Sequence, residues 1–422
     1  MDRSMPKSVS ADVLADILKP GMVVYMPGCA GESPHLVAAL RARPEAAAGV
    51  RFVGVYIPGA NRVDYAGLHA DARLTTIFLP PEFAGSYQRG AVDLMPMSYM
   101  QTYRYLGEAL AIDAAVLHLS PPDADGACSL GLAADFTPAV WRRAGLRIAH
   151  INPAMVRPHD GPTVPFDALD YVIEADGPLL QVPRAQVSPA YQALAGHIAE
   201  LVRDGDTLQF GLGQVQAAVI GALTGHRRLK IHSGMISDPL LELMDAGCLA
   251  PGPSVTCGVA LGTDRLYDAL ADDDRYRFAP VGHTHHIATL AAIDDLVAIN
   301  GAIEVDLTGQ VNAEFIGARQ VSGGGGIADF LRGAQYSTGG RGIVALTATA
   351  RGGTVSRVVP RLSGAAVTLA RNDVDYIVTE YGAARLRGRT VDERAQALMA
   401  IAAPAFRDGL ADGWRAMRRE MA

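Results

Sequence analysis

Two stretches of the sequence decide the fold, VVYMPGCAGESPHLVAAL (Val23–Leu40) and TLQFGLGQVQAAVIGAL (Thr207–Leu223). Each pattern predicts a short apolar strand, a glycine-containing turn and a helix. The interval from Gly28 to Leu40 is the same as the interval from Gly211 to Leu223. Two interpretations stay open: the chain contains two copies of one α/β unit, or it contains two unrelated units whose patterns are alike.

Short apolar runs alternate with helical patterns along the rest of the chain, which predicts an α/β fold with mostly parallel sheets. The segment Pro153–Val187 carries six prolines and only one clear strand, so we expect a domain connection there. Ser188 and Pro189 then mark the start of a new helix. We therefore predict two related α/β subdomains, residues 1–187 and 188–422.

The composition excludes several classes of protein. Of the 422 residues, 49% are hydrophobic and 19% are charged, and the net charge is −7. This balance favours a globular enzyme and gives no bulk attraction to nucleic acid. No run approaches the roughly 18 apolar residues of a membrane span, so we predict a cytoplasmic protein with neither nucleic acid nor membrane as a partner. The four cysteines form no C-x-x-C pair, which predicts buried free thiols.

The richest segment for chemistry is NGAIEVDLTGQVNAE (Asn300–Glu314). Apolar and polar side chains alternate within it, which predicts a strand over Ala298–Leu307 with Glu304 and Asp306 on one polar face. These carboxylates lie either on the solvent-exposed face of a half-buried strand or in a reaction centre. Alternation alone does not choose between the two interpretations.

A glycine-rich stretch follows in SGGGGIADFLRGA (Ser322–Ala334). Four glycines lead into a helical pattern there: Gly323, Gly324, Gly325 and Gly326. Glycine backbones and the N–H groups of a helix N-terminus can cradle an anion or an oxyanion, although a flexible connection has the same pattern. Further on, YIVTEYGAARLRG (Tyr376–Gly388) ends a strand at Glu380. That carboxylate is placed either for a site at the sheet edge or for an ion pair with a nearby arginine.

Three histidines lie close together in VGHTHHIA (Val281–Ala288). If this segment is a strand, His283 and His285 share a face and could hold a metal ion. No nearby cysteine or third spaced acid completes a ligand set, so we predict no metal site. There is also no G-x-S-x-G turn for a serine nucleophile, and no cysteine has a recognisable His and Asn setting.

Together these segments resemble the acetyl-CoA hydrolase/transferase family of class I CoA-transferases, and they are most similar to its 4-hydroxybutyrate CoA-transferase branch. The specific matches are AIEVDLTGQV and DYIVTEYGAARLRG, and further matches span most of the chain. These further matches are GMVVYMPG, SPPDADGACSLGLAADF, LQFGLG, KIHSGMISD and GTDRLYDAL. The resemblance implies two α/β subdomains of related architecture.

The resemblance also implies roles for individual residues. Glu304 falls on the catalytic glutamate, Glu380 matches a carboxylate that helps to order the site, and Gly323–Gly326 resembles the loop that lines the CoA thioester. The sequence departs from the family pattern in the VGHTHHI segment and at three further positions: Gly301 (commonly Ser), Gly324 (often Val) and Thr338 (frequently Lys). We assign to the substrate pocket the unusual histidines and the glycines of the two turns: His283, His285, Gly28 and Gly213.

The implied reaction exchanges CoA between an acyl-CoA and a free carboxylic acid by a ping-pong mechanism through a glutamyl–CoA thioester. It needs neither a metal nor a cofactor, because coenzyme A is itself a substrate. The expected partners are acyl-CoA, small carboxylic acids and a second copy of the chain in a homodimer. Two alternatives stay open: an acyl-CoA hydrolase that uses Glu304 with water as the acceptor, and an acyl-CoA-binding protein without turnover.

Overall fold

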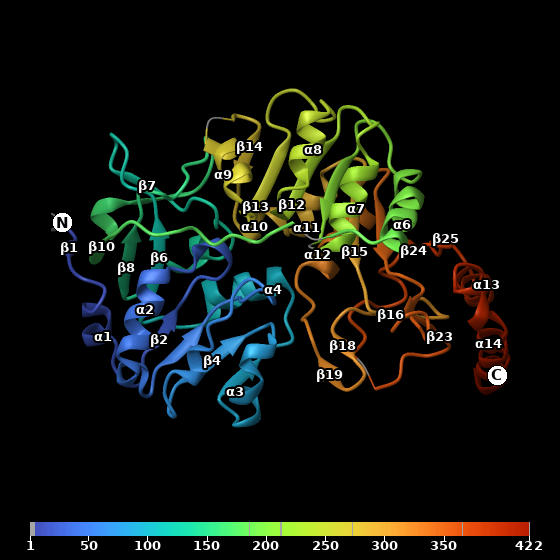
Figure 1. Cartoon of the computed structure of the whole chain (residues 1–422), viewed down its shortest axis with the longest axis horizontal. Coiled ribbons are helices and arrows are strands. Elements are labelled where there is room, and N and C mark those ends of the chain that lie inside the picture. Colours follow the sequence, from blue (N-terminus) through green and yellow to red (C-terminus); the bar gives the residue numbers. More distant parts are fainter. Residues whose placement is uncertain (1–4, 185, 212, 272, 365, 422) are drawn as a thin grey trace. The chain divides into compact units, whose positions relative to one another are not determined.

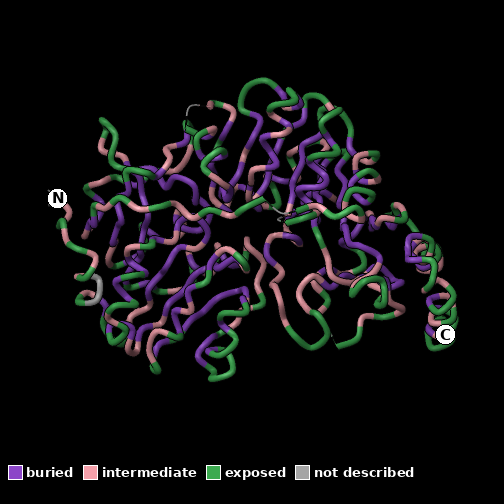
Figure 2. Tube along the Cα trace, viewed as in Figure 1, coloured by how far each residue is buried: buried purple, intermediate pink, exposed green. Residues whose placement is uncertain are grey.

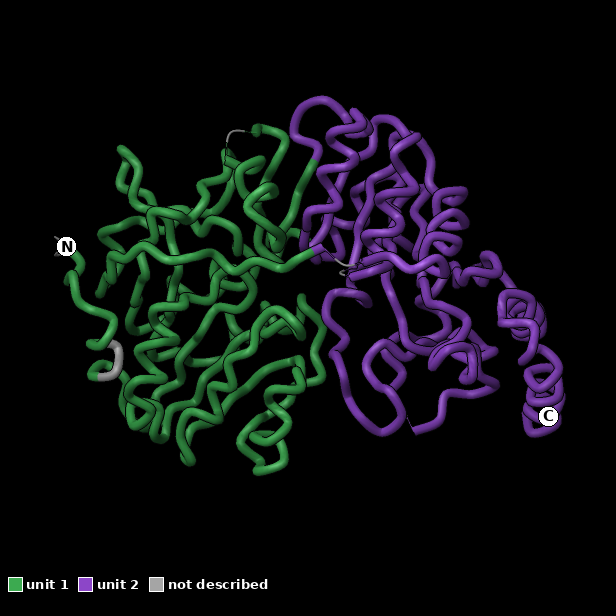
Figure 3. The backbone as a smooth tube through the Cα atoms, viewed as in Figure 1, with its two compact units in different colours: residues 1–183, 255–284 green, residues 184–254, 285–422 purple. Residues whose placement is uncertain are grey.

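The computed structural model describes residues 5–184, 186–211, 213–271, 273–364 and 366–421. The chain forms two units, one of residues 1–183 with 255–284 and the other of residues 184–254 with 285–422 (Figure 3). A segment of the first unit therefore lies inside the sequence of the second. The subdomain limits derived from the sequence, 1–187 and 188–422, stay a prediction.

The first unit is built on an eight-stranded sheet in the order β1-β10-β8-β6-β2-β3-β4-β5 (Figure 1). Every neighbouring pair in it is parallel. The strands are β1 Lys7–Ser8, β2 Val23–Tyr25, β3 Arg51–Val53, β4 Arg73–Thr76, β5 Val92–Leu94, β6 Ala114–Leu119, β8 Leu146–Ile151 and β10 Tyr171–Glu174. All residues of β6 are buried, as expected for a parallel strand with both faces covered (Figure 2).

Short helices complete the first unit: α1 Val13–Ile17, η1 Cys29–Gly31, α2 Pro34–Ala42, α3 Ala84–Gln88, α4 Tyr99–Arg104, α5 Thr137–Val140, α9 Asp264–Ala271 and α10 Val281–Thr284. The inserted segment carries two parallel strands, β13 Val255–Ala260 and β14 Tyr276–Phe278. Backbone hydrogen bonds tie it to the rest of the unit, from Ala134 N to Gly258 O and from Phe278 N to Asp160 O.

The sheet of the second unit has the order β12-β11-β15-β20-β24-β25. Its strands are β11 Thr207–Phe210, β12 Lys230–Ile236, β15 Leu296–Gly301, β20 Arg341–Ala345, β24 Tyr376–Thr379 and β25 Gly382–Arg385. The described pairs are parallel except for β24 with β25. The two mainly parallel sheets with their helices confirm the predicted α/β fold class.

The helices of the second unit are α6 Pro189–Ala199, α7 Gln214–Ala222, α8 Leu240–Asp245, α11 Ile287–Ala291, α12 Ile327–Tyr336, α13 Val391–Ala400 and α14 Arg407–Met421. Its small strands are β16 Glu304–Asp306, β17 Val311–Asn312, β18 Phe315–Ile316, β19 Arg319–Gln320, β21 Thr349–Ala350, β22 Val355–Ser356 and β23 Val358–Val359. The apolar faces of α12, α13 and α14 meet in one core that includes Phe330, Leu398 and Trp414.

The two strand–turn–helix patterns, Val23–Leu40 and Thr207–Leu223, lie in the same strand order in both units. β2 lies between β3 and β6, and β11 lies in the same way between β12 and β15. A turn and a helix follow each of these strands. α2 has Ser33 at its N-cap, where the side chain accepts a hydrogen bond from Leu36 N at 3.3 Å. α7 begins after Gly213, whose φ of 97° favours glycine.

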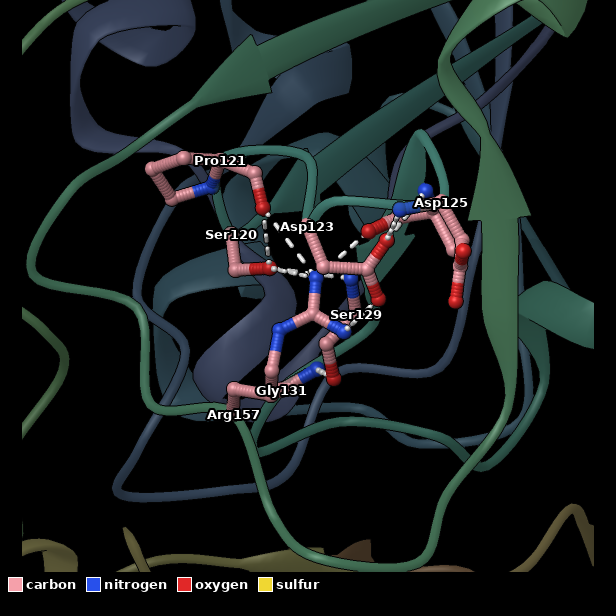
Figure 4. A network of polar contacts seen from close by, with 8 residues as sticks. Ser120, Pro121, Asp123, Asp125, Ser129, Gly131 and Arg157 are labelled. Atoms are coloured by element: carbon pink, nitrogen blue, oxygen red, sulfur yellow. Dashed lines mark hydrogen bonds and ion pairs between the residues drawn. The ribbon is translucent and has the colours of Figure 1, made fainter.

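The loop after β6 is held by one arginine (Figure 4). Arg157 pairs with Asp123 at 2.9 Å and also donates hydrogen bonds to Pro121 O and Ala127 O. Asp123 in turn accepts hydrogen bonds from two backbone N–H groups, which together with Arg157 lower its pKa. β7 Ala127–Ser129 and β9 Thr163–Pro165 pair antiparallel beside this network. The loop is therefore fixed both by the side chains of Arg157 and Asp123 and by the β7–β9 pair.

Candidate active site

The strand predicted over Ala298–Leu307 is wrong in its length. β15 ends at Gly301 and β16 begins at Glu304, and the two strands belong to different sheets. β15 continues the large sheet, whereas β16 pairs antiparallel with β17 and parallel with β23. The chain thus leaves the sheet directly before Glu304, which puts this residue in a small sheet of its own.

Glu304 lies opposite Asn312 in the β16–β17 pair and is half-buried. Asn312 Nδ2 donates to Glu304 Oε2 at 3.2 Å and to Phe315 O at 2.8 Å. One amide therefore fixes both the carboxylate and the start of the following hairpin. No other hydrogen bond to the Glu304 side chain is found among the described residues.

Asp306 does not share a wet face with Glu304, contrary to the expectation from alternation. Its side chain is fully buried, and Oδ1 accepts hydrogen bonds from Thr308 N at 2.9 Å, Thr308 Oγ1 at 2.7 Å and Gln310 N at 3.0 Å. An aspartate that bonds the backbone two residues ahead stabilises a turn. Asp306 therefore shapes the turn between β16 and β17.

The glycine-rich stretch links β19 to α12. Gly325 is buried with φ 53°, and Gly326 is the N-cap of α12 with φ −94°. Glu314, which was assigned no role from the sequence, has its carboxylate close to this stretch. Its Oε1 accepts a hydrogen bond from Thr368 Oγ1 at 2.9 Å and lies 3.9 Å from the place of a Cβ on Gly324. In the sequence, Glu314 is marked only as the last residue of VNAE, directly before the β18–β19 hairpin.

Glu380 lies between β24 and β25. Its Oε2 accepts a hydrogen bond from Ala348 N at 2.7 Å, and this bond holds the segment that follows β20. The alternative of an ion pair with Arg387 is not seen, because Arg387 pairs with the buried Asp375 at 2.7 Å. Glu380 thus orders backbone in the second unit, while its part in a reaction stays a prediction.

The three histidines are not on a strand, so the shared face that we considered for metal binding does not form. His283 lies in α10, and His286 is the N-cap of α11, where Nδ1 accepts from Ala288 N at 3.3 Å. His285 lies between these helices and is 2% exposed. Among the described residues, no group of three His, Cys, Asp or Glu side chains is arranged to hold a metal ion.

His285 is the one histidine of this segment that the structure brings to the glycine-rich stretch. A Cβ on Gly326 would stand 2.5 Å from His285 Nε2, and the ring centroid lies 4.4 Å from that of Phe330. Burial, followed by the nearby His232, lowers the pKa of His285 to about 3. The imidazole is therefore neutral at physiological pH.

The glycines assigned to the substrate pocket hold backbone turns. A Cβ on Gly28 would stand 1.8 Å from Val55 O, so the backbones after β2 and β3 approach as closely as glycine allows. Gly213 has open space around it, and glycine is favoured there because its φ is positive, at 97°. Their contact with substrate stays a prediction, as does that of His283.

The first unit holds buried ionisable groups that the sequence argument missed. Burial raises the pKa of Asp135 to about 6, and it also raises the pKa of Glu32, which accepts a hydrogen bond from Tyr65 Oη at 3.0 Å. His118 stacks on His150 with ring centroids 4.5 Å apart, and burial lowers its pKa to about 3. These residues come from separate strands and loops, so no local pattern marks them.

Comparison with known proteins covers nearly the whole chain. Residues 4–182 match the acetyl-CoA hydrolase/transferase N-terminal domain, and residues 262–413 match the C-terminal domain of the same name. The chain is 35% identical over 413 residues to the 4-hydroxybutyrate coenzyme A transferase of Clostridium kluyveri, with 96% of each chain covered.

Two further comparisons agree with this match. The succinyl-CoA:cyclohexane-1-carboxylate CoA transferase of Geobacter metallireducens is 37% identical over 339 residues, which cover 79% of this chain and 78% of that protein. The crystal structure of RipA from Yersinia pestis superposes with a TM-score of 0.90 at 29% identity, with 98% of each chain covered.

Proposed function

The chain belongs to the acetyl-CoA hydrolase/transferase family, and from this premise we propose that it transfers coenzyme A from an acyl-CoA to a free carboxylic acid. The similarity extends over almost the full length of a CoA-transferase of the same size. The observation that carries the proposal is the half-buried carboxylate of Glu304, which a single amide holds in a small sheet.

In the proposed reaction, a Glu304 oxygen attacks the thioester carbonyl, and the C–S bond breaks to give an acyl-glutamyl anhydride and CoA thiolate. The thiolate then attacks the glutamyl carbonyl, which releases the first acid and leaves a glutamyl–CoA thioester. A second carboxylate reverses both steps. Every bond that breaks is replaced by one of similar reactivity, so no external energy source is needed.

Glu304 is a better nucleophile candidate than Asp306. Three hydrogen bonds occupy Asp306 Oδ1, and the side chain is inaccessible to solvent. Each tetrahedral intermediate carries an oxyanion that needs N–H donors. We assign this role to the backbone of Gly323–Gly326, with Glu380 as a residue that orders the neighbouring chain.

The decisive experiment traps the covalent intermediate. The enzyme is incubated with acyl-CoA without an acceptor, treated with borohydride, and mapped by peptide mass spectrometry. We expect the glutamyl carboxyl of Glu304 to be reduced to an alcohol, and Glu304→Gln to lose nearly all turnover. The matched control is Glu314→Gln, another half-buried carboxylate of the same segment, which should retain the trapped adduct. Reduction at any other residue would overturn the assignment of Glu304.

The hydrolase alternative uses the same residue with water as the acceptor. Release of CoA is measured with and without a panel of short and dicarboxylic acids. A transferase releases CoA much faster when its acceptor is present, and the acceptor protects Glu304 from borohydride. Release at one rate under all conditions favours the hydrolase, and no release at all favours a non-catalytic acyl-CoA-binding protein.

We also propose that the enzyme needs no metal, because carboxylate–thioester exchange needs no Lewis acid, and that it works as a cytoplasmic homodimer. Among the described residues, no helix has the length and apolar character needed to cross a membrane. Activity should survive EDTA treatment, and light scattering should give twice the mass of 44.4 kDa. Loss of activity that zinc restores, or a monomer at assay concentration, would refute the respective part.

A further inference from the structure

His285 is enclosed by two glycines from different elements. A Cβ on Gly326 would stand 2.5 Å from Nε2 and 2.7 Å from Cδ2 of the ring, and a Cβ on Gly234 in β12 would stand 2.8 Å from Cε1 and 3.0 Å from Nε2. Neither position needs glycine for its backbone, since Gly326 has φ −94° and Gly234 is absent from the residues with positive φ. In this structure the imidazole occupies the space that a side chain at either position would need.

The ring cannot easily move away. Phe330, one turn into α12 and 2% exposed, packs against it at 4.4 Å between ring centroids. A second close contact fixes the same segment, because a Cβ on Gly333 of α12 would stand only 2.4 Å from Leu290 Cβ in α11. Residues 285–290 therefore contact α12 at two points, Gly326 and Gly333. Gly326 is the N-cap of α12.

The charge of the ring suits this location. The N-terminus of a helix carries a partial positive charge, which repels a cation and attracts an anion. Burial keeps His285 neutral, with a pKa of about 3. The imidazole therefore fills the space next to Gly326. Because the ring is neutral, it does not change the positive potential that stabilises an oxyanion at the helix N-terminus.

We propose that His285 is a positioning residue of the acyl-transfer site, whose imidazole sets the place of Gly325 and Gly326 and so aims their N–H groups at the thioester oxygen. This inference rests on the proposed function, because it assigns the oxyanion to the glycine-rich stretch. His285 acts through the loop backbone and exchanges no proton.

The experiment is a double-mutant cycle between the ring and the two glycines. Gly326→Ala places a methyl group against the ring from the loop side, and Gly234→Ala does so from the strand side without touching the loop. Because misplacement of a reacting group by about 1 Å can cost about 100-fold in rate, we expect each variant to lose between about 10- and 100-fold in kcat. The KM for acyl-CoA should stay within about twofold.

His285→Ala should relieve both variants, so that each glycine substitution costs less than about threefold in that background. Gly196→Ala, in α6 with no atom within 4 Å of the added Cβ, is the control and should change nothing. Circular dichroism checks that each variant is folded at the assay temperature. Equal costs with and without His285, or a rise in KM at constant kcat, would overturn the positioning role. An inactive wild-type enzyme would instead refute the proposed function.

Discussion

The segment after β6 in the first unit and the segment after β15 in the second occupy the same place in two similar strand orders. In the first, Arg157 and Asp123 hold residues 120–129 through side-chain hydrogen bonds. In the second, the chain forms the small β16–β19 strands and then four glycines at the start of α12. The comparison shows that two units can share one strand order while the segments that follow the equivalent strands are built differently.

The largest effect is expected at the glycine turns that follow β2 in the first unit and β11 in the second. Gly28→Ala forces a Cβ to 1.8 Å from Val55 O, whereas the matched Gly211→Ala meets only Asn300, at 3.4 Å from Oδ1 and 4.0 Å from Cα. Because a backbone carbonyl cannot rotate away, we expect Gly28→Ala to lose about 3 kcal/mol of unfolding free energy and Gly211→Ala much less. Urea unfolding measures both. Similar losses in the two variants would show that the turns are equivalent.

The two units should respond in a similar way to acid, since each buries a histidine whose pKa is lowered to about 3. The pKa of His118 and of His285 falls from 6.5 to about 3 on folding. Only the unfolded chain binds the proton between these values, so stability is complete above pH 6.5 and is lost as the pH falls toward 3. Each histidine should remove about 2 kcal/mol between pH 7 and pH 5.

The two tryptophans separate these contributions, since Trp141 lies in the first unit and Trp414 in the second. In a Trp414→Phe background, urea unfolding followed by Trp141 reports the first unit. His118→Asn should reduce the pH dependence of that signal, to which the buried His150 of the same unit also contributes. It should leave the Trp414 signal of the Trp141→Phe background as steep as before. An unchanged slope at Trp141 would show that His118 does not titrate on unfolding.

A smaller effect is expected where side chains hold the loop. Arg157→Met keeps the aliphatic stem but removes the ion pair with Asp123 and the hydrogen bonds to Pro121 O and Ala127 O. We expect a loss of about 1–2 kcal/mol and faster proteolysis within residues 120–129. Arg277→Met breaks an exposed pair with Asp160 in the same unit and is the control, because such pairs contribute little. Equal losses in the two variants would argue against the loop clamp.

The smallest effect is expected at Gly324. A Cβ there meets only Glu314 Oε1 and Thr368 Cγ2, both at 3.9 Å. Gly324→Val should therefore change stability by less than about 0.5 kcal/mol and activity by less than about threefold. Gly325→Val should cost about 1–2 kcal/mol, because the backbone at φ 53° disfavours a side chain, and should lower kcat further. Equal tolerance would remove the loop from the oxyanion site.

Many of the strands, turns and helix starts could be predicted because the residues that determine them are close together in the sequence. The apolar strands, the glycine turns and the helix starts at Pro34 and Pro189 appear within a few residues of sequence. The break between β15 and β16 could not be predicted, because alternation continues through Ile303 while the strand changes partners. Those partners, β17 and β23, follow later in the chain.

The site was harder to predict, because its contacts join distant segments. A strand over VGHTHHI would place His283 and His285 on one face, yet Pro280 O accepts hydrogen bonds from the N–H groups of His283 and Thr284 and starts α10. Nothing near His285 in the sequence shows that Gly234 and Gly326 will make room for its ring. Glu304 was singled out by motif, whereas Glu314 required the hydrogen bond to Thr368.

The insertion of residues 255–284 into the sequence of the second unit has a consequence for synthesis. When residue 183 leaves the ribosome, the first unit still lacks β13, β14, α9 and α10. Ala134 N and Phe278 N find their backbone partners only after residues 184–254 have also emerged. Neither unit can finish folding during translation before the other has begun. A gene cut near the middle would therefore yield two halves that must recover their missing contacts in trans.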